Sequence, residues 1–189
     1  MNRLNDETNI NTLNIRFNIL VTTFRYHEHN ALHEIVELLN KLGDYNAKVS
    51  YTRISGLLLC YTNLDPFRVV NDLYSIVQEE PWRIRYILRC IPIEDVVNTR
   101  IDEISASCVR LARAKIDVHE SFRISVEKRF APNIHTMDII RAVAQHIDRR
   151  VDLKHFDWNI LIEIVGNRSG ISVLKLGDIF SSVKAKRCM

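Results

Sequence analysis

Two short stretches of the sequence hold residue types that can act as metal ligands or as acids and bases. Residues 27–29 read His-Glu-His, but two histidines at positions i and i+2 without a third ligand nearby are a weak zinc pattern. Asp148, Asp152 and Asp157 also lie close together in the sequence. Aspartates in such places more often cap helices and shape turns than bind magnesium. The sequence therefore predicts no metal site, no catalytic residue and no cofactor.

Cations are unevenly distributed along the chain. Residues 1–95 hold 10 Lys/Arg and 12 Asp/Glu, a net charge of −2, whereas residues 96–189 hold 16 and 11, a net charge of +5. This asymmetry indicates that the second half contacts a polyanion, although a solvated basic surface explains it equally well. No phosphate-binding glycine loop, G-x-S-x-G nucleophile or deaminase pattern is present in the sequence.

The composition is that of an ordinary folded protein. Of 189 residues, 47% are hydrophobic and 26% charged, with only five glycines and four prolines. No apolar run approaches the roughly 20 residues that a bilayer crossing needs, and the polar amino terminus does not resemble a secretion signal. We therefore expect no membrane contact and a cytoplasmic location. The four cysteines form no C-x-x-C pair and are expected to be buried thiols.

The first half alternates between the hydrophobic periods of strands and helices. After a tail at residues 1–16, which we expect to be flexible, a domain at residues 17–93 is predicted. Its expected elements are strands at residues 17–24, 48–53, 57–61 and 84–90 and helices at residues 30–42 and 66–79. Asp65 and Pro66 form the clearest start signal, a cap followed by proline at the first helical position. The order strand, helix, strand, strand, helix, strand is that of a ferredoxin-like βαββαβ domain.

The second half is predicted to form a domain at residues 94–180, followed by a basic tail at residues 181–189. Its helix at residues 98–115 begins with Thr99 and Asp102 in capping-box positions. The other expected elements are strands at residues 122–130, 159–165 and 171–175 and a helix at residues 136–150. The last two strands flank a hairpin-sized connection.

The motifs of the second half resemble those of a THUMP domain. They are the strand FRISVEKRF at residues 122–130, the helix TMDIIRAVAQHI at residues 136–147, and the block VDLKHFDWNILIEIVGNRSGISVLKL at residues 151–176. THUMP is the RNA-binding module of thiouridine synthetases, certain tRNA guanosine methyltransferases and the adaptor of eukaryotic tRNA cytidine acetylation. The resemblance implies a mixed sheet in this domain and an α+β or α/β fold for the chain.

The first half resembles the ferredoxin-like domain that usually precedes THUMP. The segments FNILVTTFR, residues 17–25, and RISGLLLCYTNLDPFRVV, residues 53–70, are similar to those of stand-alone archaeal THUMP proteins. Members that catalyse a modification carry a further large domain, for which 189 residues leave no room. The resemblance thus implies a non-catalytic protein that grips the acceptor 3′ end of tRNA. It would serve as adaptor for a separate tRNA-modifying enzyme, cytidine acetylation being one such reaction, and would take no small-molecule substrate.

Recognition of an RNA end requires cations, hydrogen-bond donors and a flat side chain on which a base can stack. In the second half, one basic surface is expected from the side chains of Arg123, Lys128, Arg129 and Arg168. The stretch Arg25, Tyr26 and His27 is expected to border the same groove from the first half. Phe156 and Trp158 are interpreted as packing residues.

Two other functions stay open at this point. The first is a small RNA-modifying enzyme that uses one of the three aspartates. The second is a scaffold subunit without RNA affinity, which would bind a protein through the basic outer face of its fourth strand, formed by Arg83, Arg85 and Arg89.

Overall fold

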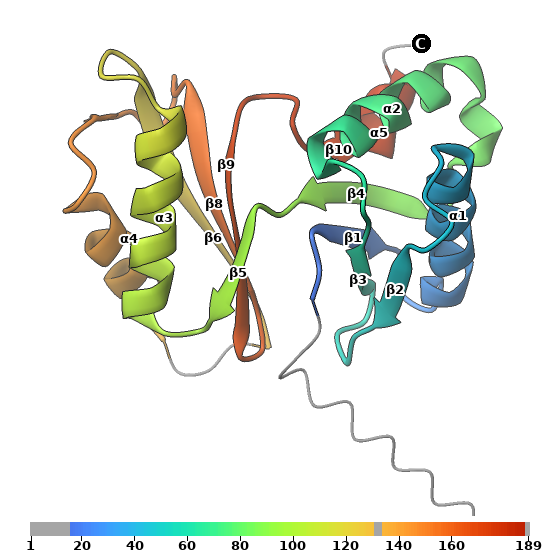
Figure 1. Ribbon diagram of the computed structural model, residues 1–189, viewed down its shortest axis with the longest axis horizontal. Coiled ribbons are helices and arrows are strands. Elements are labelled where there is room, and N and C mark those ends of the chain that lie inside the picture. The colour runs from blue at the N-terminus through green and yellow to red at the C-terminus, as the bar shows by residue number, and fades with distance from the viewer. Residues whose placement is uncertain (1–15, 131–133, 188–189) are drawn as a thin grey trace, which may run out of the picture.

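The computed structural model describes residues 16–130 and 134–187, which form two five-stranded sheets with helices on their outer sides (Figure 1). Of the expected tail at residues 1–16, only Arg16 is among the described residues. The expected α+β fold with a mixed sheet in the second half is confirmed. Within the described residues, no helix combines the length and the apolar character that crossing a membrane requires.

The first sheet contains the strands of the first half and a short strand from the end of the chain. Its elements are β1 (Ile19–Thr23), α1 (Glu28–Lys41), β2 (Lys48–Tyr51), β3 (Leu57–Tyr61), α2 (Pro66–Glu79), β4 (Ile87–Pro92), β10 (Phe180–Ser181) and α5 (Ser182–Arg187). The strand order is β10-β4-β1-β3-β2, and each neighbouring pair is antiparallel. A 3₁₀ turn at Pro81–Arg83 leads from α2 towards β4.

The second sheet is mixed. Its elements are β5 (Asp95–Asn98), α3 (Ile101–Lys115), β6 (Ser121–Arg129), α4 (Thr136–Ala144), β7 (Arg150–Val151), β8 (Trp158–Val165) and β9 (Arg168–Leu174). The strand order is β5-β9-β8-β6-β7. Strand β6 runs parallel to both β7 and β8, whereas β9 is antiparallel to β5 and β8.

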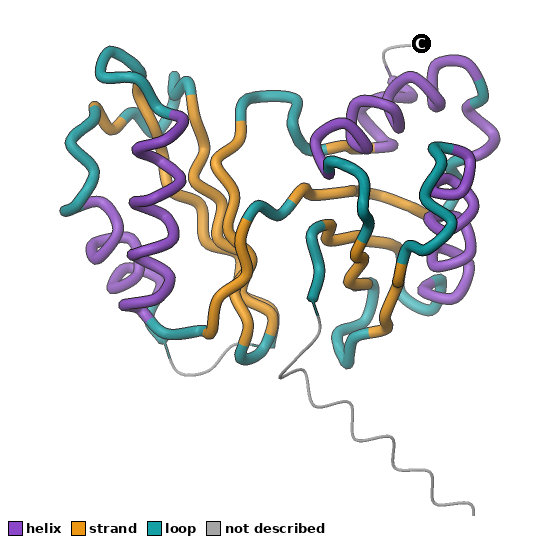
Figure 2. The backbone as a smooth tube through the Cα atoms, in the orientation of Figure 1, coloured by secondary structure: helices purple, strands orange, loops and turns teal. Residues whose placement is uncertain are grey.

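The two sheets lie between two layers of helices. In Figure 1, α3 and α4 cover the second sheet on the left, and α1, α2 and α5 cover the first sheet on the right; Figure 2 shows the strands between them. The sheets share one apolar cluster, to which the buried side chains Phe17, Leu20, Leu57, Leu59, Ile91, Ile93, Leu161, Val165 and Leu174 belong. The contact is close at Gly170, where an added Cβ would lie 3.1 Å from the Ile93 side chain and 3.3 Å from the Phe17 ring.

The helix-start signal at Asp65 and Pro66 is realised as expected, and a glycine shapes the β2–β3 turn that precedes it in the chain. The Asp65 carboxylate accepts a hydrogen bond from the Arg68 backbone N–H at 2.8 Å, and Pro66 occupies the first helical position of α2. The turn between β2 and β3 contains Gly56 with φ +75°, and an added Cβ there would lie 2.7 Å from the Thr23 carbonyl oxygen. Glycine therefore supplies both the positive φ and the close approach to β1.

The capping box predicted at Thr99 is wrong. Residues 95–98 form strand β5 on the edge of the second sheet, so α3 begins at Ile101 and Arg100 is its N-cap residue. The Thr99 hydroxyl lies 3.0 Å from the Ser169 hydroxyl and 3.3 Å from the Gly166 carbonyl oxygen. Pairing with β9 thus outweighs the local helix-start signal.

Three expected boundaries also differ. Helix α4 ends at Ala144, so its last turn does not contain Arg149 and Arg150. The fourth strand begins at Ile87, because residues 81–86 form the 3₁₀ turn and its exit. The segment expected to be a basic tail continues the fold through β10 and α5, and Phe180 is buried in the core of the first sheet against the Tyr74 ring.

The cysteine prediction holds for the described residues. Cys60, Cys90 and Cys108 are free and buried. Burial raises the pKa of the Cys60 and Cys108 thiols to about 12, so these thiols are unreactive at neutral pH. Cys188 lies outside the described residues.

Candidate nucleic-acid interface

Two of the predicted arginines lie at one end of the second sheet. Strand pairing places Asn98 opposite Arg168, Arg168 opposite Val165, and Val165 opposite Arg129. Arg129 and Arg168 are therefore two strands apart, or roughly 10 Å across the sheet. Their side chains belong to the sheet face that is turned away from α3 and α4, because Ile124 and the other even-numbered residues of β6 pack against those helices.

A buried carboxylate orients Arg129. Its Nε donates to Oε2 of Glu163 at 3.2 Å, and the Glu163 side chain is 0% exposed. Burial raises the pKa of Glu163, while Arg129 and Arg89 oppose this rise and Glu127 adds to it. Because the ion pair uses Nε, the terminal amino groups of Arg129 are left to donate elsewhere. Glu163 Oε1 has no hydrogen-bond partner among the described residues.

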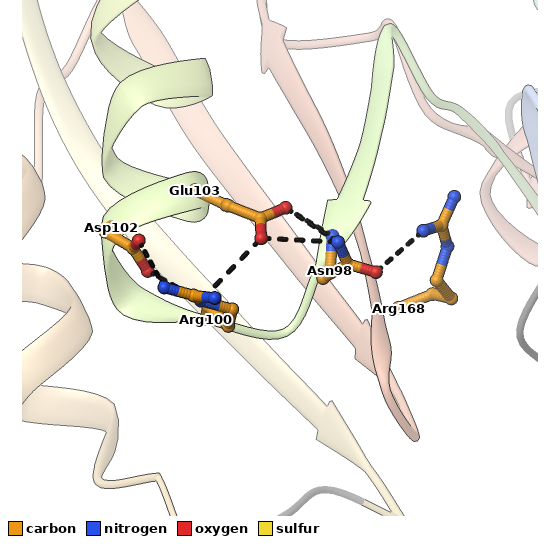
Figure 3. Close-up of polar contacts among 5 residues, drawn as sticks. All are labelled: Asn98, Arg100, Asp102, Glu103 and Arg168. Atoms are coloured by element: carbon orange, nitrogen blue, oxygen red, sulfur yellow. Dashed lines mark hydrogen bonds and ion pairs between the residues drawn. The ribbon is translucent and has the colours of Figure 1, made fainter.

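An amide and two ion pairs hold Arg168 from the side of β5 (Figure 3). Arg168 Nη1 donates to Asn98 Oδ1 at 2.9 Å, and Asn98 Nδ2 donates to Glu103 Oε2 at 2.9 Å. Arg100 then lies between two carboxylates, 3.7 Å from Glu103 and 2.9 Å from Asp102. Arg168 Nε is buried and has no hydrogen-bond partner in the described part of the chain. The network fixes one terminal nitrogen of Arg168 and leaves the other to an external acceptor.

The other two predicted cations are not part of this cluster. Arg123 lies six residues earlier on β6, roughly 20 Å from Arg129 along the strand, and its guanidinium stacks 4.0 Å above the Phe156 ring. The even spacing keeps Arg123 on the same sheet face as Arg129. Lys128 projects from the opposite face, and its Nζ donates to the Ile134 carbonyl oxygen at 2.8 Å. Of the four residues expected to form one basic surface, Arg123, Arg129 and Arg168 thus share a sheet face, whereas Lys128 lies on the opposite face.

The candidates of the first half follow strand β1. Arg25 and Tyr26 are exposed, and the exposed fraction of Tyr26 is 91%. Glu28 anchors this turn to the β2–β3 turn, because its Oε1 accepts the Gly56 N–H at 2.6 Å; that bond lowers the pKa of Glu28. His27 instead stacks against the Tyr86 ring, with ring centroids 5.4 Å apart.

The β2–β3 turn brings this region near the second sheet. Ile54 of this turn packs into the apolar cluster that also contains Val165, the last residue of β8. In Figure 1, the β2–β3 turn, the carboxyl end of β6 and the β8–β9 turn lie along the lower side of the molecule. The candidates from the two halves therefore flank the same contact between the sheets.

A groove of about 800 Å³ runs along the other side of this contact, next to β5. The first half of the chain contributes Arg16, Tyr61 and Phe67 to the groove, and the second half contributes Val96 and Arg168. The Arg16 guanidinium lies 4.6 Å from the centroid of the Tyr61 ring. Arg168 thus connects this groove with the sheet end that holds Arg129. Arg16 belongs to the segment predicted to be a tail, and no signal in the sequence distinguishes it.

Two of the three aspartates that could act as acids or bases accept hydrogen bonds that hold the local backbone. Among residues 16–130 and 134–187, no group of three or more His, Cys, Asp or Glu side chains is arranged to hold a metal ion. Asp152 caps a turn by accepting two backbone N–H groups, those of residues 154 and 155, and these bonds lower its pKa. Asp157 accepts the backbone N–H and the hydroxyl of Ser121, which lowers its pKa as well. His29 lies 3.1 Å from the His33 ring nitrogen.

The structure brings to this sheet end three residues that the sequence alone does not place there. Glu163 interrupts the apolar strand ILIEIV, and a charged residue in such a run is a usable signal, because buried charges are almost always paired. Arg89 was expected on a solvent face, yet it belongs to the electrostatic surroundings of Glu163. The sequence predicts Phe130 as the last residue of a strand, but it follows β6 and is 83% exposed.

The comparisons with known proteins concern the second half most directly. The family model of the THUMP domain matches residues 98–174. No curated protein sequence matches the chain.

Solved structures share the fold of both halves at low sequence identity. PH1313 from Pyrococcus horikoshii is 18% identical with a TM-score of 0.63, over 84% of this chain and 54% of that one. TrmN from Thermus thermophilus is 15% identical with a TM-score of 0.52, over 82% and 44%. A 4-thiouridine synthetase solved with RNA and ATP is 10% identical with a TM-score of 0.54, over 88% and 42%. The chain thus spans about half of each of these proteins.

Proposed function

Because residues 98–174 form a THUMP domain, we propose that the protein binds tRNA through the end of its second sheet. The tRNA is gripped at its single-stranded acceptor 3′ end, and the protein acts as an adaptor for a separate tRNA-modifying enzyme. Cytidine acetylation is one reaction that such an adaptor would serve. The βαββαβ unit in front of the THUMP domain is proposed to be ferredoxin-like, which its strand order β4-β1-β3-β2 supports.

The observation that carries the proposal is the pair Arg129 and Arg168. Both side chains lie on one face of one sheet end, and protein groups fix each guanidinium from behind: Glu163 for Arg129 and Asn98 for Arg168. An arginine that is oriented in advance loses less side-chain freedom when it binds a phosphate. Phosphate contacts supply much of the affinity for RNA and set the register.

The adaptor role follows from the advantage of holding one part of a tRNA. Once the acceptor end is bound, the body of the tRNA reaches a partner enzyme at high effective concentration. The distance between the gripped end and the partner's active site would then select the nucleotide to be modified. The partner enzyme would catalyse the modification, so the purified protein alone should leave the nucleoside composition of tRNA unchanged. A modified nucleoside formed in that incubation would make the protein an enzyme.

The structure does not form the basic strand face that the competing scaffold hypothesis requires. Arg83 belongs to the 3₁₀ turn and forms an ion pair with Glu80, and Arg85 lies before β4 and donates to the Trp82 carbonyl oxygen. Arg89 lies on β4 within reach of the field of Glu163. These three arginines therefore do not form one basic strand face.

The proposal is tested with a pair of charge-reversal variants of equal net charge. Arg25→Glu with Arg168→Glu changes the proposed interface, and Lys184→Glu with Arg187→Glu makes the same change of four charges on α5. We expect the interface variant to lose at least about tenfold in tRNA affinity and to show a shallower salt dependence, since each lost phosphate contact reduces the log–log slope by about 0.7 to 0.9. The α5 variant should lose much less affinity. Equal losses in the two variants would contradict this placement of the site.

A further inference from the structure

Two exposed aromatic residues adopt a backbone conformation that bulky side chains avoid. Among the described residues, Tyr26 and Phe130 are the non-glycine residues with positive φ, at +67° and +52°. Glycine, asparagine and aspartate tolerate this left-handed region, whereas a large aromatic residue there is an outlier. The exposed fractions are 91% for Tyr26 and 83% for Phe130.

The described part of the fold does not explain these side chains. At such exposure, neither ring contributes much to a core, so packing does not offset the strain of the backbone. Glycine or asparagine would form either turn with less strain and less exposed apolar surface. The residue choice therefore points to a contact outside the chain.

The two residues also occupy similar positions in the sequence, next to an arginine and close to the end of a strand. Each directly follows an arginine: Arg129 is the last residue of β6, and Arg25 comes two residues after the end of β1. The backbone next to Phe130 is held by the hydrogen bond from Gly166 N to Arg129 O at 3.1 Å. A cation beside a flat ring matches one nucleotide of a single strand, whose phosphate pairs with the cation while its base stacks on the ring.

We propose that Phe130 and Tyr26 are stacking platforms for unpaired bases of RNA, with Arg129 and Arg25 taking the neighbouring phosphates. This inference rests on the proposed tRNA binding and specifies its ligand as single-stranded nucleotides with free base faces. In a duplex the base faces are covered by their neighbours, so the platforms select an unpaired end over a helix. The repetition of the arginine–aromatic pair on both sheets suits a ligand that itself repeats phosphate and base.

The test compares alanine variants on a defined probe. The probes are a single-stranded RNA oligonucleotide ending in CCA and a blunt RNA duplex of the same length. Phe130→Ala and Tyr26→Ala should each weaken binding of the single strand by about 5- to 20-fold, the lower part of the range for loss of one stacked base. Tyr45→Ala is the matched control, because Tyr45 is also an aromatic residue with 79% exposure and lacks both a positive φ and a preceding arginine. Phe130→Leu, which keeps apolar bulk without a flat ring, should behave like Phe130→Ala.

Oligonucleotides with single abasic positions separate stacking from an indirect effect. At the position that stacks on Phe130, removal of the base should weaken binding by the wild-type protein, and Phe130→Ala should then cause no further loss. The inference would be overturned if the wild-type protein bound the single strand and both Phe130→Ala and Tyr26→Ala bound it with affinities within twofold of the wild type. That result would leave the proposed tRNA binding standing. The inference would also be overturned if the affinity loss caused by Phe130→Ala added to the loss caused by every abasic position, because no base would then stack on Phe130. Absence of wild-type binding to either probe and to whole tRNA would instead refute the proposed function.

Discussion

Replacing Arg129 by methionine tests whether Arg129 and the buried Glu163 form an ion pair that contributes to the stability of the fold. Methionine keeps much of the length and apolar surface of the arginine stem but removes the partner of Glu163, whose side chain is 0% exposed. Breaking a buried pair on one side usually costs 3–5 kcal/mol, because a charge is left without compensation. Burial raises the pKa of Glu163 even with Arg129 present, so the variant should respond by protonating Glu163.

The cost of protonating Glu163 sets an upper limit on how much the substitution lowers the free energy of unfolding. Protonating a carboxyl group costs about 1.4 kcal/mol for each pH unit above its ordinary pKa of about 4.3, hence roughly 3.7 kcal/mol at pH 7 and 1.6 kcal/mol at pH 5.5. Arg89 still attracts the carboxylate, so we expect a loss of about 2 to 3.5 kcal/mol at pH 7. Removing Arg129 raises the folded-state pKa of Glu163 further. Below the wild-type pKa of Glu163, which burial already raises, the carboxyl group is protonated in both folded proteins. The deficit of the variant relative to the wild type should therefore grow as the pH rises above that folded-state value and shrink as the pH falls towards it.

Urea unfolding at about pH 5.5 and pH 7 measures the predicted pH dependence. The double variant Arg129→Met with Glu163→Gln is the control, because glutamine keeps the shape of the side chain without its charge. Its free energy of unfolding should return to within about 1 kcal/mol of the wild-type value at pH 7. A deficit that is the same at both pH values, or that the second substitution does not reduce, would refute this reasoning.

The remaining predictions concern local structure. Asp65→Ala should cost about 1 kcal/mol in urea unfolding through loss of the α2 cap, whereas Asp65→Asn should cost little; equal losses would argue against a capping role. Gly56→Ala should lower stability by about 2 kcal/mol or more, since its Cβ would lie 2.7 Å from the Thr23 carbonyl oxygen at φ +75°; thermal unfolding within about a degree of wild type would contradict this. Phe130→Gly should be about 1 kcal/mol more stable than Phe130→Ala, because only glycine relieves the left-handed conformation; the reverse order would show that the conformation is not strained.

The elements with strong local signals could be predicted from the sequence. Asp65 followed by Pro66 specifies the start of α2, and the alternation of residues 122–129 specifies β6 with its even-numbered residues towards the helices. The motifs of the second half also lead to the THUMP domain. Each of these depends on neighbours in sequence, which is why one sequence suffices.

The elements that depend on distant partners could not be predicted. Strand β5 forms because residues 95–98 pair with β9, 70 to 76 residues away, and β10 forms because Ser181 pairs with Arg89. The site shows the same limit. The sequence supplied Arg129 and Arg168, but their common face depends on the strand register, and the same register separates Lys128 from them.

The central claim is that the protein grips the single-stranded end of tRNA, and one binding measurement tests it most directly. The affinity of the purified protein is measured for intact tRNA and for the same tRNA without its single-stranded 3′ end, over a series of salt concentrations. We predict strong binding to intact tRNA that weakens steeply with salt, and a loss of at least about tenfold when the 3′ end is removed. Equal binding to the two tRNAs, or binding that salt does not weaken, would contradict the account.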